Sequence, residues 1–185
     1  MTPLERSGDV NYENHFPDDN AYPGALGDYA CSVGDNTNGD YNTEKANGAF
    51  AVATHAYAPS PPADRYVMAS WSSNTSFRSI RDGLSNTIFI GEKHVPEDRF
   101  GERESGDSCI YNDDHPQVNA RIAGPGHTLA HTSTEAFNIQ FGSYHPGICQ
   151  FLLGDGSVRP IGVEISGTIL GYLSVRNDGH VIPDY

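Results

Sequence analysis

The chain has 185 residues, a length typical of one domain with a buried core. Its formal net charge of −13, from 24 acidic and 11 basic residues, disfavours nucleic acid as a partner, because the phosphates would be repelled. Apolar residues make up only 37%, whereas Gly and Pro number 20 and 12. This balance favours short strands joined by turns over long helices. No apolar run in the sequence approaches the ~18 residues of a membrane-spanning helix, so we predict no membrane span.

Residues 1–22 form a polar segment ahead of the predicted domain, which covers residues 23–185. A segment this polar cannot bury itself and becomes ordered only against another surface. Val10, Tyr12 and Phe16 are all even-numbered, so an extended segment would present them on one face. We therefore expect an extended N-terminal arm that lies along a neighbouring copy of the chain and places these three side chains in apolar pockets.

The remaining residues predict a series of short elements, in which apolar runs form strands and clusters of Gly, Pro, Asn and Asp form turns. In chain order, the expected strands are 25–33, 49–57, 66–71, 87–95, 148–153, 158–161 and 181–182. The other expected elements are a proline loop at 58–62, a helical turn at 79–86, a strand or short helix at 134–140 and a helix at 166–175. We predict a mainly β fold, a β-sandwich or jelly-roll-like domain with one or two short helices and the extended arm.

The stretch from Phe141 to Ile161 predicts a buried strand, a glycine-containing turn and a return strand. Pro160 has no N–H to donate, so the return strand should lie at the edge of its sheet. His145 is followed after nine residues by Asp155 and Gly156. Across an extended strand at ~3.3 Å per residue, the His145 and Asp155 side chains would lie more than ~20 Å apart. We therefore assign them to two corners of a hairpin rather than to a catalytic pair.

The spacing of His145, Asp155 and Gly156 resembles the C-terminal signature of a large bacterial family of prepilin-like secreted proteins. Those proteins have no known molecular function, and some carry a solute-binding-protein label. Further stretches that resemble the family are Pro23–Asp35, Asn47–Phe50, Ile80–Pro96, Ala120–Gly126 and Leu170–Tyr185. The resemblance implies secretion, and typical members begin with a prepilin cleavage site and a long apolar helix. This sequence starts MTPLERSGDV, so we expect a processed or shortened form, or a relative without that helix.

Residues 35–40 form a loop that is rich in side-chain oxygens. Ca²⁺ prefers such ligands, so the loop offers four candidate calcium ligands: Asp35, Asn36, Asn38 and Asp40. The spacing departs from the calcium loop of helix–loop–helix proteins, and a turn made of Asn and Asp is the commoner use of these residues. Ca²⁺ is the one cofactor for which the sequence offers a candidate site.

Two further features bear on export. Asn74 opens an Asn-Thr-Ser sequon and is a candidate glycosylation site. Cys31, Cys109 and Cys149 fit no zinc spacing. Either two of them form a disulfide and one thiol is left over, or all three are small buried residues, and the sequence does not select the pair.

Hydrolase, zinc-protease and phosphate-loop motifs do not occur in the sequence, so we predict that the protein is not an enzyme. We predict instead a structural subunit, extracellular or at the cell surface. It would be pilin-like or fibre-forming and would assemble head to tail with other copies of itself through the N-terminal arm. The alternative is a secreted module that binds a glycan or another solute, for which the ten Tyr residues offer stacking surfaces.

Overall fold

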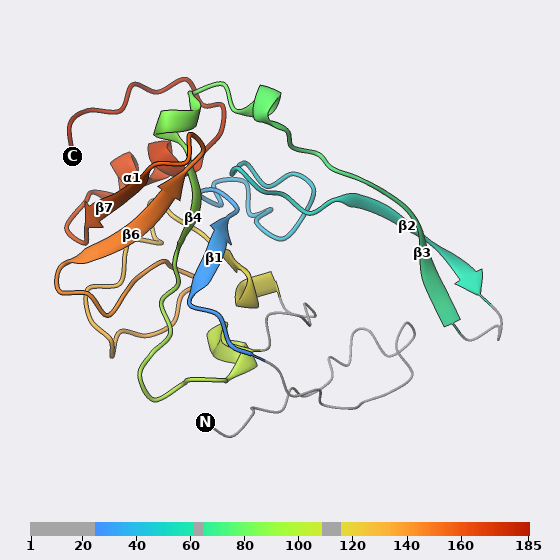
Figure 1. Cartoon of the computed structure of the whole chain (residues 1–185), viewed down its shortest axis with the longest axis horizontal. Coiled ribbons are helices and arrows are strands. Elements are labelled where there is room, and N and C mark those ends of the chain that lie inside the picture. The colour runs from blue at the N-terminus through green and yellow to red at the C-terminus, as the bar shows by residue number, and fades with distance from the viewer. Residues whose placement is uncertain (1–24, 61–64, 109–115) are drawn as a thin grey trace.

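Figure 1 shows the computed structural model, which describes residues 25–60, 65–108 and 116–185. The body of the molecule is built on a five-stranded sheet in the order β5-β1-β4-β6-β7, and a two-stranded ribbon of β2 and β3 extends away from it. These two sheets and a single α-helix among the described residues confirm the mainly β prediction. The predicted arm at residues 1–22, with Val10, Tyr12 and Phe16, lies outside the described residues.

The body and the ribbon divide the strands between them. The strands of the body are β1 (Tyr29–Ser32), β4 (Ile88–Glu92), β5 (Ala120–Arg121), β6 (Ile148–Leu153) and β7 (Val158–Gly162). The ribbon consists of β2 (Thr54–Ser60) and β3 (Arg65–Ser72). The helical elements are η2 (Phe77–Ser79), η3 (Leu84–Asn86), η4 (Arg103–Ser105), η5 (Pro116–Val118) and α1 (Gly167–Ser174). Neighbouring strands of the body pair antiparallel, except that β5 runs parallel to β1.

The main hydrophobic core lies between this sheet and α1. Along β6, Cys149, Phe151 and Leu153 alternate with half-buried residues, so one face of the strand points into the core. The helix adds Leu170 and Leu173, both wholly buried. Their spacing of three places them on one side of a helix, which is why the sequence predicted α1 correctly.

Gly91 is placed in β4 because a side chain would not fit there. The ring of Phe151 packs edge to face on that of Phe141, with ring centroids 5.2 Å apart. A Cβ on Gly91 would come within 2.4 Å of Phe151 and 2.7 Å of Phe141. The absence of a side chain therefore lets the two rings pack directly on the strand.

A buried polar cluster lies directly after the C-terminal end of β4. Lys93 Nζ lies 2.8 Å from Asp107 Oδ1, and both side chains are almost wholly buried. Arg121, also wholly buried, donates to the carbonyl oxygens of His94 and Gly106. Asp107 thus pairs directly with Lys93 and offsets the charge of Arg121 through space. Burial lowers the pKa of Lys93 below its usual value and that of Arg121 to about 9.

Three predicted elements differ from the structure. The predicted loop at 58–62 is wrong at its start, because β2 continues to Ser60 and Pro59 lies opposite Tyr66; a two-stranded ribbon tolerates proline because each strand has an unpaired edge. Residues 134–140 form neither a strand nor a helix. No strand forms at 181–182 either, where Val181 is 89% exposed and so packs on almost nothing. β7 is an edge strand of the sheet, as Pro160 predicted.

Candidate interaction surface

The ribbon carries a β-bulge that rearranges its side chains. β2 and β3 pair with His55 opposite Trp71, Ala56 opposite Ser70 and Tyr57 opposite Met68. Ala69 is therefore the extra residue, with no partner in the register. Cross-strand partners point to the same face of a sheet, and residues two apart along a strand do so as well. The bulge therefore brings Met68 and Trp71, which are three residues apart, onto one face. We call the set His55, Tyr57, Met68 and Trp71 the ribbon face.

The two faces of the ribbon differ in character. On the ribbon face, Trp71 is 68% exposed, Met68 54% and Tyr57 41%. Among the residues whose side chains the structure describes, those on the opposite face are small: Thr54, Ala56, Ala58, Ser70 and Ser72. Met68 and Trp71 are each more than half exposed, and exposed apolar residues gathered in this way mark an interaction surface.

An aromatic cluster lies at the base of the ribbon. Phe89 packs edge to face with Phe50, at a centroid distance of 5.7 Å, and stacks with Phe77 at 6.0 Å. Phe50 comes shortly before β2 and Phe77 shortly after β3, so the cluster joins the ribbon to β4. Phe77 is 69% exposed, so part of this aromatic cluster is open to solvent.

The predicted glycosylation residue also lies at this base. Asn74 Nδ2 donates to the carbonyl oxygen of Val52 at 2.9 Å, and Asn74 Oδ1 accepts from Thr54 Oγ1 at 3.1 Å. The side chain is exposed, yet the nitrogen that would carry a sugar already ties the two ends of the ribbon together. Glycosylation of Asn74 stays a prediction, and the bonds observed give this side chain a structural role.

The signature histidine lies at one end of β6. His145 Nε2 is 3.1 Å from Glu92 Oε1, and Glu92 Oε2 accepts from the Gln150 N–H at 2.7 Å. The partner of the histidine ring is therefore the carboxylate of the last residue of β4, the strand that pairs with β6. The His145 N–H donates to Ser143 Oγ at 3.0 Å, which completes a hydrogen-bonded corner.

The signature aspartate lies at the opposite end of β6. Asp155 Oδ1 accepts from the N–H and the hydroxyl of Ser157, at 2.9 and 2.6 Å. These bonds lower the pKa of Asp155 below its usual value. Gly156 has a φ of 85°, which the tight turn requires. As the sequence predicted, His145 and Asp155 lie at opposite ends of β6, and each fixes one corner of the hairpin.

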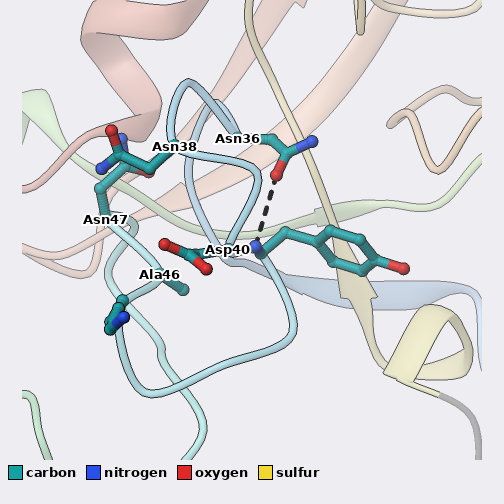
Figure 2. A pocket seen from close by; sticks show the side chains of 7 residues that line it. Asn36, Asn38, Asp40, Ala46 and Asn47 are labelled. Atoms are coloured by element: carbon teal, nitrogen blue, oxygen red, sulfur yellow. Dashed lines mark hydrogen bonds between the residues drawn. The ribbon is translucent and has the colours of Figure 1, made fainter.

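The oxygen-rich loop uses its candidate calcium ligands internally. Asp35 Oδ1 accepts from Asn47 Nδ2 at 2.7 Å and from the Thr37 N–H at 3.0 Å. Figure 2 shows Asn36 turned away from Asn38 and Asn47, with its Oδ1 accepting from the Tyr41 N–H at 3.3 Å. Calcium binding at this loop stays a prediction. An ion there would compete with these hydrogen bonds for the same oxygens.

The acidic side chain of Asp40 lines the same hollow as Asn38 and Asn47 (Figure 2). In the described part of the chain, no group of three or more His, Cys, Asp and Glu side chains gathers in a way that could hold a metal ion. Those four residue types leave out the amides of Asn36 and Asn38, so calcium binding by the four residues of this loop stays untested.

The comparisons with known proteins give a family but no activity. A family model, SBP_bac_10, described as "Protein of unknown function (DUF1559)", matches residues 14–166. The chain belongs to this family. No curated protein and no solved structure matches it. The match spans β1 to β7 of this DUF1559 protein, including the ribbon and the signature hairpin, and α1 begins one residue beyond it.

Two remaining predictions concern the membrane and the cysteines. Within residues 25–60, 65–108 and 116–185, this DUF1559 protein has no helix with the length and hydrophobicity needed to cross a bilayer. Cys149 is buried in β6, where its Sγ contacts the carbonyl oxygen of Glu92, and burial raises the pKa of its thiol. Cys31 lies in β1, and Cys109 lies outside the described residues, so the disulfide pairing stays open.

Proposed function

We propose that this DUF1559 protein is an extracellular structural subunit that assembles head to tail with copies of itself. The projecting ribbon would be the acceptor for a neighbouring copy. One observation carries the proposal: a β-bulge collects Tyr57, Met68 and Trp71 on a single exposed face of a ribbon that stands away from the body (Figure 1). A fold that only needed a connection between β1 and β4 would not require such a face.

The distribution of charge supports a second copy as the partner. The whole chain carries −13, so most of its surface repels another copy. Between residues 54 and 74, however, the sequence has only Asp64 and Arg65 as charged residues, and their charges cancel. The ribbon is therefore an exposed part of this acidic protein through which two copies can meet with little like-charge repulsion.

The N-terminal arm supplies a suitable donor. Each strand of the ribbon has one backbone edge that no described strand pairs with, and such an edge accepts an added strand through main-chain hydrogen bonds. An extended arm would present Val10, Tyr12 and Phe16 on one face, which can continue the ribbon face across the new strand pair. A third strand also stabilises a ribbon that is marginal with two.

The arm of each copy would thus bind the ribbon of the next. A contact between two different surfaces leaves one free arm and one free ribbon at the ends, so it continues into a filament unless the geometry closes a ring. The acidic, Asn- and Gly-rich composition, with only two lysines, supports an extracellular setting. The proposed role is non-catalytic and pilin-like in the sense of a repeating subunit.

A mixing experiment tests this arrangement. One variant lacks residues 2–20 and keeps its ribbon, whereas a second carries Met68→Ser and Trp71→Ser and keeps its arm. Each alone should sediment as a monomer in analytical ultracentrifugation. Mixed in equal amounts, they should form a heterodimer that grows no further, because each pair has one intact arm and one intact ribbon.

A matched control replaces Val181, which is 89% exposed and distant in sequence from the ribbon, by Ser together with Tyr185→Ser. This variant should assemble like the unmodified chain. Self-association of the arm-deleted variant alone would show that ribbons bind ribbons and would refute the arm as donor. Monomeric unmodified protein at all concentrations would refute the proposed function.

A further inference from the structure

A groove separate from the ribbon lies between the 35–47 loop and α1. Its volume is about 300 Å³, at the lower end of the range for small-molecule sites. One wall is formed by Asp35, Thr37, Asn38 and Asn47, and the other by α1 and the segment that follows it. The loop approaches α1 closely because Gly124 lies between them, where a Cβ would come within 2.7 Å of Asp35 Cβ.

The second wall carries an aromatic pair. The rings of Tyr172 and His180 stack at a centroid distance of 4.1 Å and an angle of 21°. Asp82 holds the segment beneath His180 by accepting from the N–H groups of Asp178 and Gly179, at 2.7 and 2.9 Å. The pair is therefore presented by a fixed backbone, although His180 itself is exposed.

The side chains of the first wall keep hydrogen-bonding groups that the protein itself does not use. Asp35 N–H donates to Asn47 Oδ1 at 3.2 Å, and Asn47 Nδ2 returns a bond to Asp35 Oδ1 at 2.7 Å. A side-chain amide has two N–H donors and two acceptor lone pairs, so Asn47 keeps one of each for a ligand. The exposed Asn38 amide makes no hydrogen bond within the part of the chain that the structure describes, so all of its capacity remains.

We propose that this groove binds one unit of an uncharged saccharide. Asn38 and Asn47 would hydrogen-bond its hydroxyl groups, and the stacked pair of Tyr172 and His180 would bound its apolar ring face. The mixture of donors and acceptors selects the ligand class. Asp35 and Asp178 repel anions. An organic cation without acceptors would leave the amide and hydroxyl donors of the groove unpaired. The hydroxyl groups of a sugar can pair with both the donors and the acceptors.

This inference stands apart from the assembly role, because none of these residues belongs to the ribbon or the arm. The test titrates the full-length, isotope-labelled chain with methyl glucoside, methyl galactoside, methyl mannoside and N-acetylglucosamine. Amide NMR signals of residues 35–38 and 172–180 should shift with at least one of these sugars, and those of 54–60 and 65–72 should not.

Substitutions at three exposed positions test whether the groove is a specific binding site. Asn38→Ala should weaken binding about fivefold, the loss of one hydrogen bond. His180→Ala should weaken it by a similar factor through lost stacking, about fivefold. Asn42→Ala, in the same loop but outside the groove, should leave the affinity unchanged. The proposal is overturned if none of the four sugars shifts the groove signals, or if only glucuronate or choline does so.

Discussion

His145 Nε2 lies 3.1 Å from Glu92 Oε1, so the histidine of the signature hairpin is held by the last residue of β4. Glu92 is only 14% exposed at its side chain, whereas His145 is 55% exposed. The carboxylate also accepts from the Gln150 N–H, which places it between β4, the hairpin corner and β6. Glu92 should therefore contribute more than His145 to the free energy of unfolding, and mutation of each residue measures the difference.

We expect Glu92→Ala to lower the free energy of unfolding by about 1–3 kcal/mol, because it leaves the Gln150 N–H without its acceptor. His145→Ala should cost less than about 1 kcal/mol, since it removes only a partly exposed pair. Urea denaturation measures both. Glu164→Ala is the control, because Glu164 pairs with His131 while 88% exposed. Equal losses for Glu92→Ala and Glu164→Ala would contradict the account.

Gly91→Ala should destabilise the protein by about 1–3 kcal/mol, because the new methyl group overlaps Phe151 and Phe141. Gly162→Ala is the matched control at the edge strand β7, where a Cβ would meet nothing within 4 Å. That change should alter stability by less than about 1 kcal/mol. Chemical denaturation of the two variants gives the comparison, and a tolerated Gly91→Ala would argue against the packing described for the two rings.

The buried cluster of Lys93, Asp107 and Arg121 predicts how strongly different substitutions lower the free energy of unfolding. Lys93→Met should destabilise the protein, but the charge of Asp107 still offsets that of Arg121 through space. Asp107→Asn should be worse, because it leaves two buried cations without a carboxylate, and breaking a buried pair costs about 3–5 kcal/mol. Lys45→Met, at an exposed position, serves as the control and should stay within about 0.5 kcal/mol. Thermal and urea unfolding would reveal a reversed order.

Asp35 predicts a dependence on pH. Burial on its own would raise the pKa of Asp35, but hydrogen bonds from Asn47 and Thr37 outweigh it, so the pKa lies below its ordinary 3.8. The folded protein then binds fewer protons than the unfolded chain as pH falls below 3.8, and stability is lost there. The Tm advantage of the unmodified chain over Asp35→Asn should therefore be full above that pH and shrink below it. A constant difference across this range would contradict the hydrogen bonding.

The ribbon predicts concentration-dependent hydrogen exchange. A two-stranded ribbon is marginally stable in water, so amides of β2 and β3 should exchange quickly in dilute protein. At concentrations where copies assemble, the same amides should become protected, whereas those of β6 should be protected throughout. Mass-spectrometric exchange at the two concentrations checks this. Ribbon amides that exchange equally fast in both would show that no strand is added.

Local signals in the sequence predicted part of this architecture. The hairpin followed from an apolar run and Gly156, and α1 from the spacing of Leu170 and Leu173. The ribbon face was missed, because Met68 and Trp71 share a face only through the bulge, and a register shift leaves no local signal. The partner of His145 was missed for a related reason: sheet topology, not sequence distance, brings Glu92 beside it.

The central claim is that one copy's arm lies on another copy's ribbon. The most direct measurement places the photo-crosslinker p-benzoylphenylalanine at position 71 in place of Trp71 and, in a control, at position 185 in place of Tyr185. Illumination should give covalent dimers only for position 71, with the crosslink mapped to residues 2–20 of the second copy. No dimer at position 71, or equal yields at both positions, would contradict the proposed assembly.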